Sequence, residues 1–214
     1  MKHENKTMLY QRQNFLFLIE HLKGLVREMK KDLLLIVDMQ NVYLPGNEWE
    51  CPSIYGTINK IKYLLDRGVE AIFTRFIKPQ PIGTWENYNK TYEKINNSVY
   101  LNDIVAELKL YTNKFPVYNK STYSSWTEDV KIMSEKYDRI ILCGVVADCC
   151  ILSTLFSIID SGKEVIYLKD CISGKNSDNE KMIQKLVENF SPVHVNIMDS
   201  KSYYKKYKSM GILS

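Results

Sequence analysis

The sequence predicts an α/β fold of three layers, in which helices cover both faces of a six-stranded parallel sheet. Two observations lead to this fold class. Short runs of consecutive apolar residues recur along the chain, and such runs are typical of strands that are buried on both faces. Segments with helical apolar spacing separate these runs, and this alternation favours parallel pairing through right-handed crossovers.

The strands are expected where the apolar runs have strand length. The first run, DLLLIVD at residues 32–38, is apolar throughout between two aspartates. The complete set of expected strands is 32–38, 69–75, 115–120, 139–143, 164–168 and 192–197. All of these runs have the length of ordinary strands, so they suit one sheet.

The helices are expected where apolar residues recur every three or four positions. Gly68 and Gly162 follow two of these segments, and glycine is a common stop signal at a helix C-terminus. The expected helices are 55–67, 98–110, 127–136, 149–161, 178–189 and 199–208. Residues 76–97 and 169–177 lack clean periodicity and are expected to be loops. The aromatic residues of the first loop suit either a pocket lining or a cover over the core.

The chain divides into an N-terminal arm, residues 1–30, and one domain, residues 31–214. In the arm, apolar residues from Phe15 to Met29 recur at helical spacing, which predicts an amphipathic helix. Its apolar face would be buried either against the body of the same chain or against a second copy.

Composition limits the classes of function. The 214 residues are 45% hydrophobic and carry a net charge of +4, which does not call for a nucleic acid or an anionic membrane as partner. The apolar run in the arm is too short to span a membrane. Five cysteines, an odd number without a secretory signal, indicate free thiols in a reducing cytoplasm. Only three histidines are present, so a histidine-rich metal site is poorly supplied.

Three reactive residues occupy the ends of expected strands. Asp38 closes the first strand, Lys120 closes the third, and Cys150 follows the fourth, beside Cys149 at the start of a helix. Ligands of open parallel sheets bind beyond the carboxyl ends of the strands, and a helix N-terminus favours a thiolate. Each residue alone has an ordinary explanation, as a turn former, a solvated cation or a small core residue. Together they form an acid, a base and a nucleophile.

Three motifs in these places resemble one known family. Residues 35–43 (LIVDMQNVY) resemble an apolar strand followed by D-x-Q-x-x-F, residues 120–126 (KSTYSSW) resemble K-x-x-x-S-A-F, and residues 144–154 (GVVADCCILST) resemble G-x-x-T-D-x-C-V-x-x-T. The chain is therefore similar, over about residues 32–198, to the isochorismatase-like cysteine hydrolases, which include nicotinamidases and N-carbamoylsarcosine amidases. Tyr43, Ser125, Trp126 and Ala147 depart from the family pattern.

The resemblance implies a Rossmann-like fold of the isochorismatase type and a role for each site residue. Cys150 is the nucleophile, Asp38 moves its proton and Lys120 supports both. The family pattern implies a cis peptide bond between Val145 and Val146, with the N–H groups of Val146 and Cys150 forming an oxyanion hole. The nicotinamidase branch carries metal ligands after its second strand, whereas this chain has TRFIKP at residues 74–79 without histidine or aspartate. We therefore expect neither a metal nor another cofactor.

The expected activity is hydrolysis of a C–N bond in a small amide or ureido compound through a thioester. Substrate contacts are expected from Tyr43, Trp85, Tyr123 and Trp126. Three alternatives stay open: an isochorismate-type vinyl-ether hydrolase, a silent family member that acts in binding or assembly, and a thiol redox protein that uses Cys149 and Cys150. The resemblance also implies a homo-oligomer, a dimer or larger, to which the arm is a candidate contributor.

Overall fold

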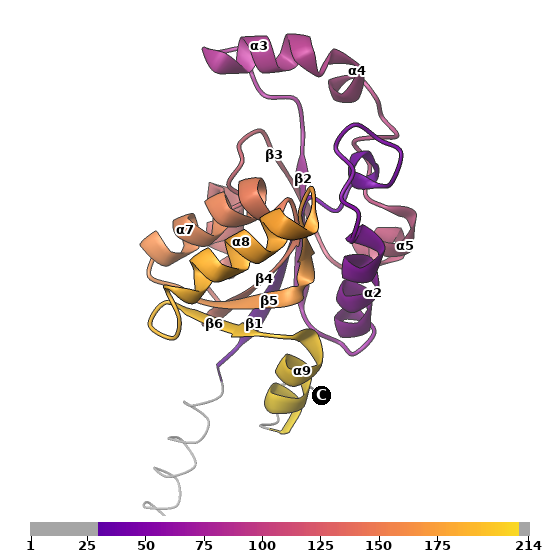
Figure 1. Ribbon diagram of the computed structural model, residues 1–214. Coiled ribbons are helices and arrows are strands. Elements are labelled where there is room, and N and C mark those ends of the chain that lie inside the picture. The colour runs from indigo at the N-terminus through magenta and orange to yellow at the C-terminus, as the bar shows by residue number, and fades with distance from the viewer. Residues whose placement is uncertain (1–29, 210–214) are drawn as a thin grey trace, which may run out of the picture.

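The computed structural model describes residues 30–209 and contains one sheet of six parallel strands (Figure 1). The strands are β1 (Asp32–Val37), β2 (Ala71–Phe76), β3 (Val117–Lys120), β4 (Arg139–Val145), β5 (Glu164–Ser173) and β6 (Val195–Met198). Their order is β3-β2-β1-β4-β5-β6. The predicted fold class is confirmed, and the chain reverses its direction across the sheet between β1 and β4, which makes this the point where a ligand site is expected.

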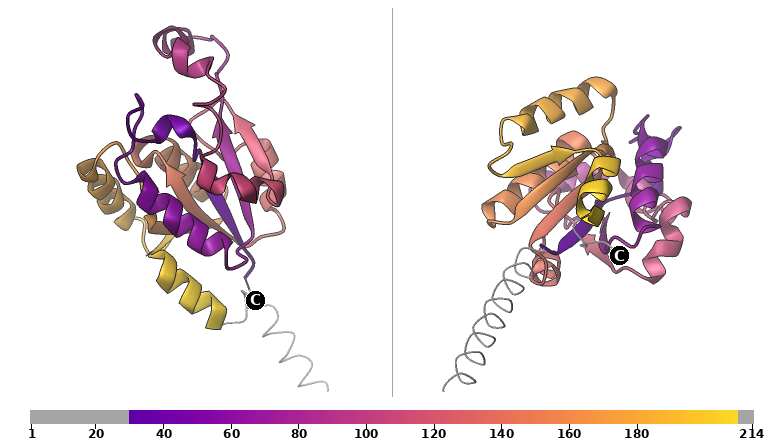
Figure 2. Two further views of the ribbon diagram at one scale, coloured as in Figure 1. Left: turned by 90° about the vertical axis from the view of Figure 1, so that its right-hand side faces the viewer. Right: turned by 90° about the horizontal axis from the view of Figure 1, so that it is seen from below.

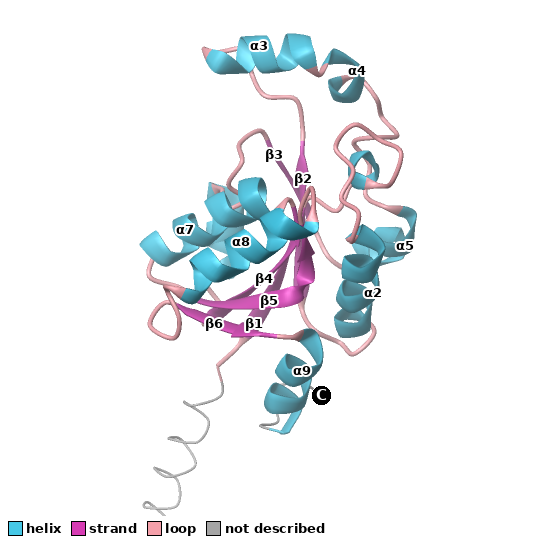
Figure 3. Ribbon diagram, in the orientation of Figure 1, coloured by secondary structure: helices cyan, strands magenta, loops and turns pink. Residues whose placement is uncertain are grey.

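Helices cover both faces of the sheet. The helices are α2 (Ile54–Leu65), α3 (Thr84–Thr91), α4 (Glu93–Asn96), α5 (Ala106–Lys109), α6 (Glu128–Ser134), α7 (Leu152–Asp160), α8 (Ser177–Glu188) and α9 (Ser200–Ser209). Shorter turns are η1 (Asn41–Tyr43), η2 (Leu110–Asn113) and the π-helical η3 (Ala147–Ile151). Figures 2 and 3 show the strands between two helical layers.

Alternation along the buried strands divides the core in two. In β1, Leu34 and Ile36 face a core shared with α2, α5 and α9, whereas Leu33 and Leu35 face a core shared with α6, α7 and α8. All four side chains are fully buried. This arrangement explains why the first strand is apolar throughout, because both of its faces lie under helices.

Residues 76–97 differ from the loop that the sequence predicted, since they contain α3 and α4. These two helices lie beyond the end of β2 (Figure 1). Trp85, Tyr88 and Tyr92 follow one another at spacings of three and four, so they share one helical face. Trp85 and Tyr88 contact Phe76, and Tyr88 and Tyr92 contact Trp49. Aromatic packing therefore holds a polar segment that has little helical signal of its own.

Residues 98–110 were predicted to form one helix, but only α5 at their end is helical. The preceding segment pairs with the turn after β1, where Asn41 N–H donates to Asp103 O and Val42 N–H donates to Leu101 O. These tertiary hydrogen bonds replace helical ones. A second difference concerns β5, which continues to Ser173 where a loop was expected from residue 169 on, because it resumes pairing with β4 after a register shift.

The arm predicted at residues 1–30 lies outside the described residues except for Lys30, which forms an ion pair with Glu164. Within the part of the chain that is described, no helix has both the length and the apolar character needed to cross a membrane.

Candidate active site

Asp38 is the first residue after β1 and is held in one orientation. Its backbone has a φ of +51°, which is uncommon for a residue other than glycine. Its carboxylate is fully buried, and Oδ1 accepts a hydrogen bond of 3.0 Å from the Thr74 hydroxyl at the neighbouring strand β2. The turn after β1 therefore directs a fixed carboxylate toward the centre of the sheet edge.

Lys120 ends β3 and lies against this carboxylate. Its Nζ is 2.7 Å from Asp38 Oδ2, and both side chains are fully buried. The ammonium also donates to the carbonyl oxygens of Thr122 and Tyr123, at 2.9 and 3.1 Å. Burial alone would lower the pKa of Lys120, but its contacts with the Asp38 carboxylate and the Cys150 sulfur raise it. Lys120 is therefore a cation with a complete set of partners.

Cys150 lies in η3 and completes the cluster. Its buried Sγ is 3.5 Å from Lys120 Nζ. Burial and the negative charge of Asp38 raise the pKa of the Cys150 thiol, although Lys120 partly offsets them. The sequence indicated that the helix N-terminus would favour a thiolate, whereas in this structure burial is the largest influence on the thiol and acts against ionisation.

The link between β4 and η3 shapes the backbone beside Cys150. The Val145–Val146 peptide bond is cis, at the position that the family resemblance implied. The Val146 carbonyl accepts from the N–H groups of Cys149 and Ile151, both at 3.1 Å, which closes the π-helical turn. Val146 also lines the pocket in which Cys150 lies.

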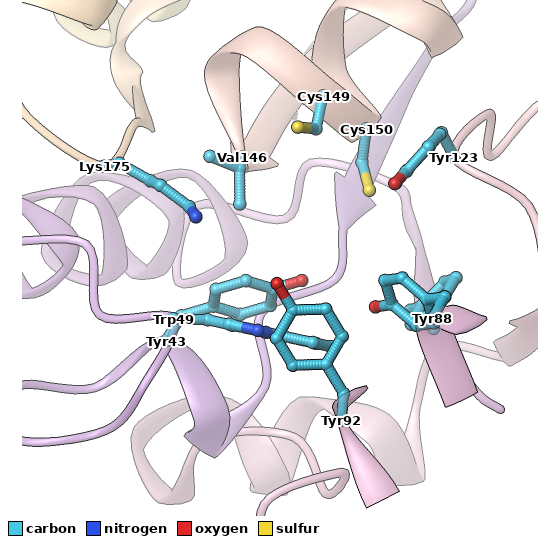
Figure 4. A pocket seen from close by; sticks show the side chains of 10 residues that line it. Tyr43, Trp49, Tyr88, Tyr92, Tyr123, Val146, Cys149, Cys150 and Lys175 are labelled. Atoms are coloured by element: carbon cyan, nitrogen blue, oxygen red, sulfur yellow. The ribbon is translucent and has the colours of Figure 1, made fainter. Parts of the chain in front are cut away.

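An open pocket with about 520 Å³ of empty space, its mouth included, lies over the cluster (Figure 4). It is lined by Tyr43, Trp49, Phe76, Tyr88, Tyr92, Tyr123, Val146, Cys149, Cys150 and Lys175. Aromatic rings form most of this wall, and the Cys150 thiol points into the space between them. The pocket thus suits a small ligand with flat or apolar parts.

The expected pocket residues are placed in two ways. Tyr43 and Tyr123 line the cavity, whereas Trp85 and Trp126 do not. Trp85 lies behind the lining, with its ring 5.1 Å from Tyr88 and 5.3 Å from Tyr123. Trp126 is buried in the core under α6 and α7. Both expectations are corrected, because these rings pack against protein rather than against the cavity.

A comparison with protein families decides the identity of the fold. The sequence-family model of the isochorismatase domain matches residues 32–199 of this chain. The chain belongs to the isochorismatase family. A comparison with curated proteins finds no match.

Several solved structures share the isochorismatase fold with this chain at low sequence identity. A cysteine hydrolase from Pseudomonas syringae pv. phaseolicola 1448A is 18% identical, with a TM-score of 0.73 over 84% of this chain and 93% of that one. An isochorismatase family protein from Desulfovibrio vulgaris is 17% identical, with a TM-score of 0.70 over 84% and 99%. A nicotinamidase from Bacillus subtilis is 13% identical, with a TM-score of 0.64 over 79% and 99%.

The metal site of the nicotinamidase branch does not fit the residues of this isochorismatase-family chain. Residues 74–79 carry neither histidine nor aspartate. Within residues 30–209, no group of three or more histidine, cysteine, aspartate or glutamate side chains is arranged to hold a metal ion. No step below therefore uses a metal.

Sequence reasoning missed two kinds of site residue. Thr74 connects the motifs, because its hydroxyl contacts both Asp38 Oδ1 and the Ser125 hydroxyl at 3.0 Å. Ser125 N–H in turn donates to Thr154 Oγ1 at 2.8 Å. Trp49 and Lys175 were also missed, since they lie in loops without a motif. Tyr88 and Tyr92 were not missed, because the aromatic residues of 76–97 were expected either to line a pocket or to cover the core, and these two line the pocket.

Proposed function

We propose that the protein is a cysteine hydrolase that cleaves a C–N bond of a small amide or ureido compound without a metal. One observation carries this proposal: the Lys120 ammonium lies 2.7 Å from Asp38 and 3.5 Å from the sulfur of Cys150, and Cys150 lines an open pocket. A buried cation between a carboxylate and a thiol costs desolvation energy and is most readily explained by chemistry.

The first half of the reaction forms a thioester. Asp38 accepts the proton of the Cys150 thiol while Sγ forms a bond to the substrate carbonyl carbon. Lys120 stabilises the sulfur anion as it develops. The C–N bond then breaks, and Asp38 returns the proton to the leaving nitrogen, which departs as ammonia or an amine.

The second half releases the acid. A water molecule loses its proton to Asp38 and attacks the thioester carbonyl. The C–S bond breaks, the proton passes from Asp38 to Sγ, and the carboxylic acid leaves. In both halves the carbonyl oxygen becomes negative, and we assign the N–H groups of Val146 and Cys150 as its donors. Loss of one such donor reduces the rate by about 10²–10³.

The test is ammonia release from a panel of small amides and ureido compounds, together with mass spectrometry of the quenched enzyme. We expect ammonia and an acyl adduct on the peptide that contains Cys150. Cys150→Ala lowers the rate by a factor of at least about 10³, while its circular dichroism spectrum is unchanged. Cys149→Ala still forms the adduct, which shows that the adduct is on Cys150 and not on the adjacent Cys149.

Other results would move the assignment. A Cys150→Ala variant with the native rate would exclude the covalent scheme. Cleavage of a vinyl ether that survives Cys150→Ala but is lost in Asp38→Asn would favour the isochorismate-type hydrolase. A native protein that turns over no compound in the panel would favour a binding or assembly role.

A further inference from the structure

Lys175 gives the pocket a charge that the proposed reaction does not use. It lies in the loop between β5 and α8, and its side chain lines the pocket (Figure 4). Among the described residues that line this pocket, it is the one with a full charge, since the others are aromatic, apolar or thiol side chains. Its ammonium enters from the side opposite Tyr123, with Val146 and Cys149 above the space between them.

The loop that carries Lys175 is fixed on both sides. Gly174 N–H donates to Glu180 Oε1 at 2.9 Å. The Asn176 side chain caps α8 by accepting hydrogen bonds from two N–H groups in its first turn, at 3.1 and 2.8 Å. Its neighbours in the chain are therefore held before any ligand arrives, while Lys175 itself is exposed.

The nearby carboxylates of Glu180 and Asp148 bind other groups, although Asp148 Oδ1 is buried without a hydrogen-bond partner among the described residues. Glu180 Oε1 also contacts the hydroxyls of Ser53 and Ser173, and Asp148 Oδ2 accepts from the Asn179 amide at 3.1 Å. Within residues 30–209, no carboxylate lies within ion-pair distance of Lys175. Its charge nevertheless reaches the pocket: burial and the negative charge of Asp148 raise the pKa of the adjacent Cys149, and Lys175 opposes this rise.

We propose that Lys175 is an anion-binding subsite, and that the substrate carries a carboxylate at the end remote from the scissile carbonyl. This inference rests on the proposed function only for the position of that carbonyl, at Cys150. The flat body of the ligand would lie along the rings of Trp49 and Tyr43, and its carboxylate would pair with the Lys175 ammonium.

Binding separates this proposal from the catalytic one. The Cys150→Ala protein is titrated with two pairs of amides that match in size and differ in charge: terephthalamate against para-toluamide, and succinamate against butanamide. Quenching of tryptophan fluorescence reports binding, because Trp49 lines the pocket. We expect at least one carboxylate to bind about tenfold more tightly than its neutral counterpart at low salt, and this preference to shrink as salt screens the charge.

Substitution at the loop then tests the residue. Lys175→Met removes the preference, Lys175→Glu reverses it and Lys175→Arg keeps it. Lys181→Met is the matched control, because it removes one positive charge from an exposed position on α8 and keeps the preference. The proposal is overturned if neither carboxylate binds more tightly than its neutral counterpart, or if Lys175→Met leaves the preference intact. These outcomes do not depend on turnover, so a failure of catalysis is seen separately.

Discussion

Gly144 in β4 approaches Val37 in β1 so closely that no side chain fits between them. A Cβ built on Gly144 would lie 2.1 Å from the Val37 carbonyl oxygen, and the φ of Gly144 is +115°. The two residues are register partners in the sheet. Asp38 follows one of them directly and Cys150 follows the other by six positions, so this contact sets the spacing between the candidate base and nucleophile.

Gly144→Ala is therefore expected to destabilise the fold and to disturb the site. The backbone has to separate, and the left-handed φ is strained for alanine, so the cost is about 3–5 kcal/mol. Urea unfolding measures it. Gly56→Ala in α2 is the control, because a Cβ there meets nothing within 4 Å, and it should stabilise the protein by about 0.5–1 kcal/mol. Equal effects of the two substitutions would contradict the contact.

Asp32, at the amino-terminal end of β1, gives a prediction about how stability depends on pH. Tyr203 in α9 donates to Asp32 Oδ2 at 2.8 Å, and Arg139 Nε donates to Oδ1 at 2.6 Å. Burial raises the pKa of Asp32, and both partners oppose this rise. Tyr203→Phe should cost about 1.5–3 kcal/mol at pH 7, where Asp32 is ionised, since the lost hydrogen bond was made to a charge.

The same substitution should cost less in acid. Removing Tyr203 raises the pKa of Asp32 further, so the variant binds a proton at a higher pH than the native protein does. As pH falls through that raised pKa, protonation relieves the buried charge and the difference in unfolding free energy shrinks. Unfolding at pH 4 and pH 7 measures it. Tyr100→Phe, at an exposed ring, is the control, and a cost that grows in acid would exclude this explanation.

Where local pattern and burial agree, the sequence was sufficient to predict the fold. The first strand is buried on both faces and apolar throughout, so its extent was predicted to within one residue. Residues 98–105 carry a helical pattern that the sequence cannot rank against hydrogen bonds to the turn after β1. The helix α3 was not predicted because its own sequence has little helical pattern, and its stability comes from aromatic contacts with Trp49 and Phe76.

The same distinction applies to the site. Asp38, Lys120 and the pair Cys149 and Cys150 were singled out because they lie at or after strand ends, and the carboxyl ends of parallel strands meet at one edge. The family resemblance then selected Cys150 over Cys149. Trp126 was assigned to the pocket on residue type alone, although its direction depends on how α6 packs. Lys175 had no local signal at all. The direction of the pKa shift of Cys150 also required the structure, since it depends on how deeply the thiol is buried.

The buried pair of Asp38 and Lys120 should show strong coupling in a double-mutant cycle. Lys120→Met leaves an unpaired buried carboxylate and should cost about 3–5 kcal/mol, whereas Asp38→Asn together with Lys120→Met should cost less than the sum of the two single changes. Urea unfolding at neutral pH measures all four proteins. Because the pKa of Lys120 is raised, its contribution persists through neutral pH and is lost only as pH rises through that raised value. Additive costs would argue against a direct ion pair.

Alkylation of Cys150 should respond to its two charged neighbours in opposite directions. In a Cys149→Ala background, iodoacetamide should react slowly at neutral pH, because the pKa of the buried Cys150 thiol is raised. Asp38→Asn removes one cause of that rise, so the pKa falls and alkylation accelerates; below the pKa, each unit is worth about tenfold in thiolate. Lys120→Met removes the opposing charge and should slow the reaction.

Mass spectrometry of the Cys150 peptide over a pH series measures both rates, with alkylation in urea as the control for equal intrinsic reactivity. If Asp38→Asn slowed alkylation instead, the negative charge of Asp38 would not be what limits the reactivity of this thiol, and Asp38 would be promoting alkylation by accepting the thiol proton.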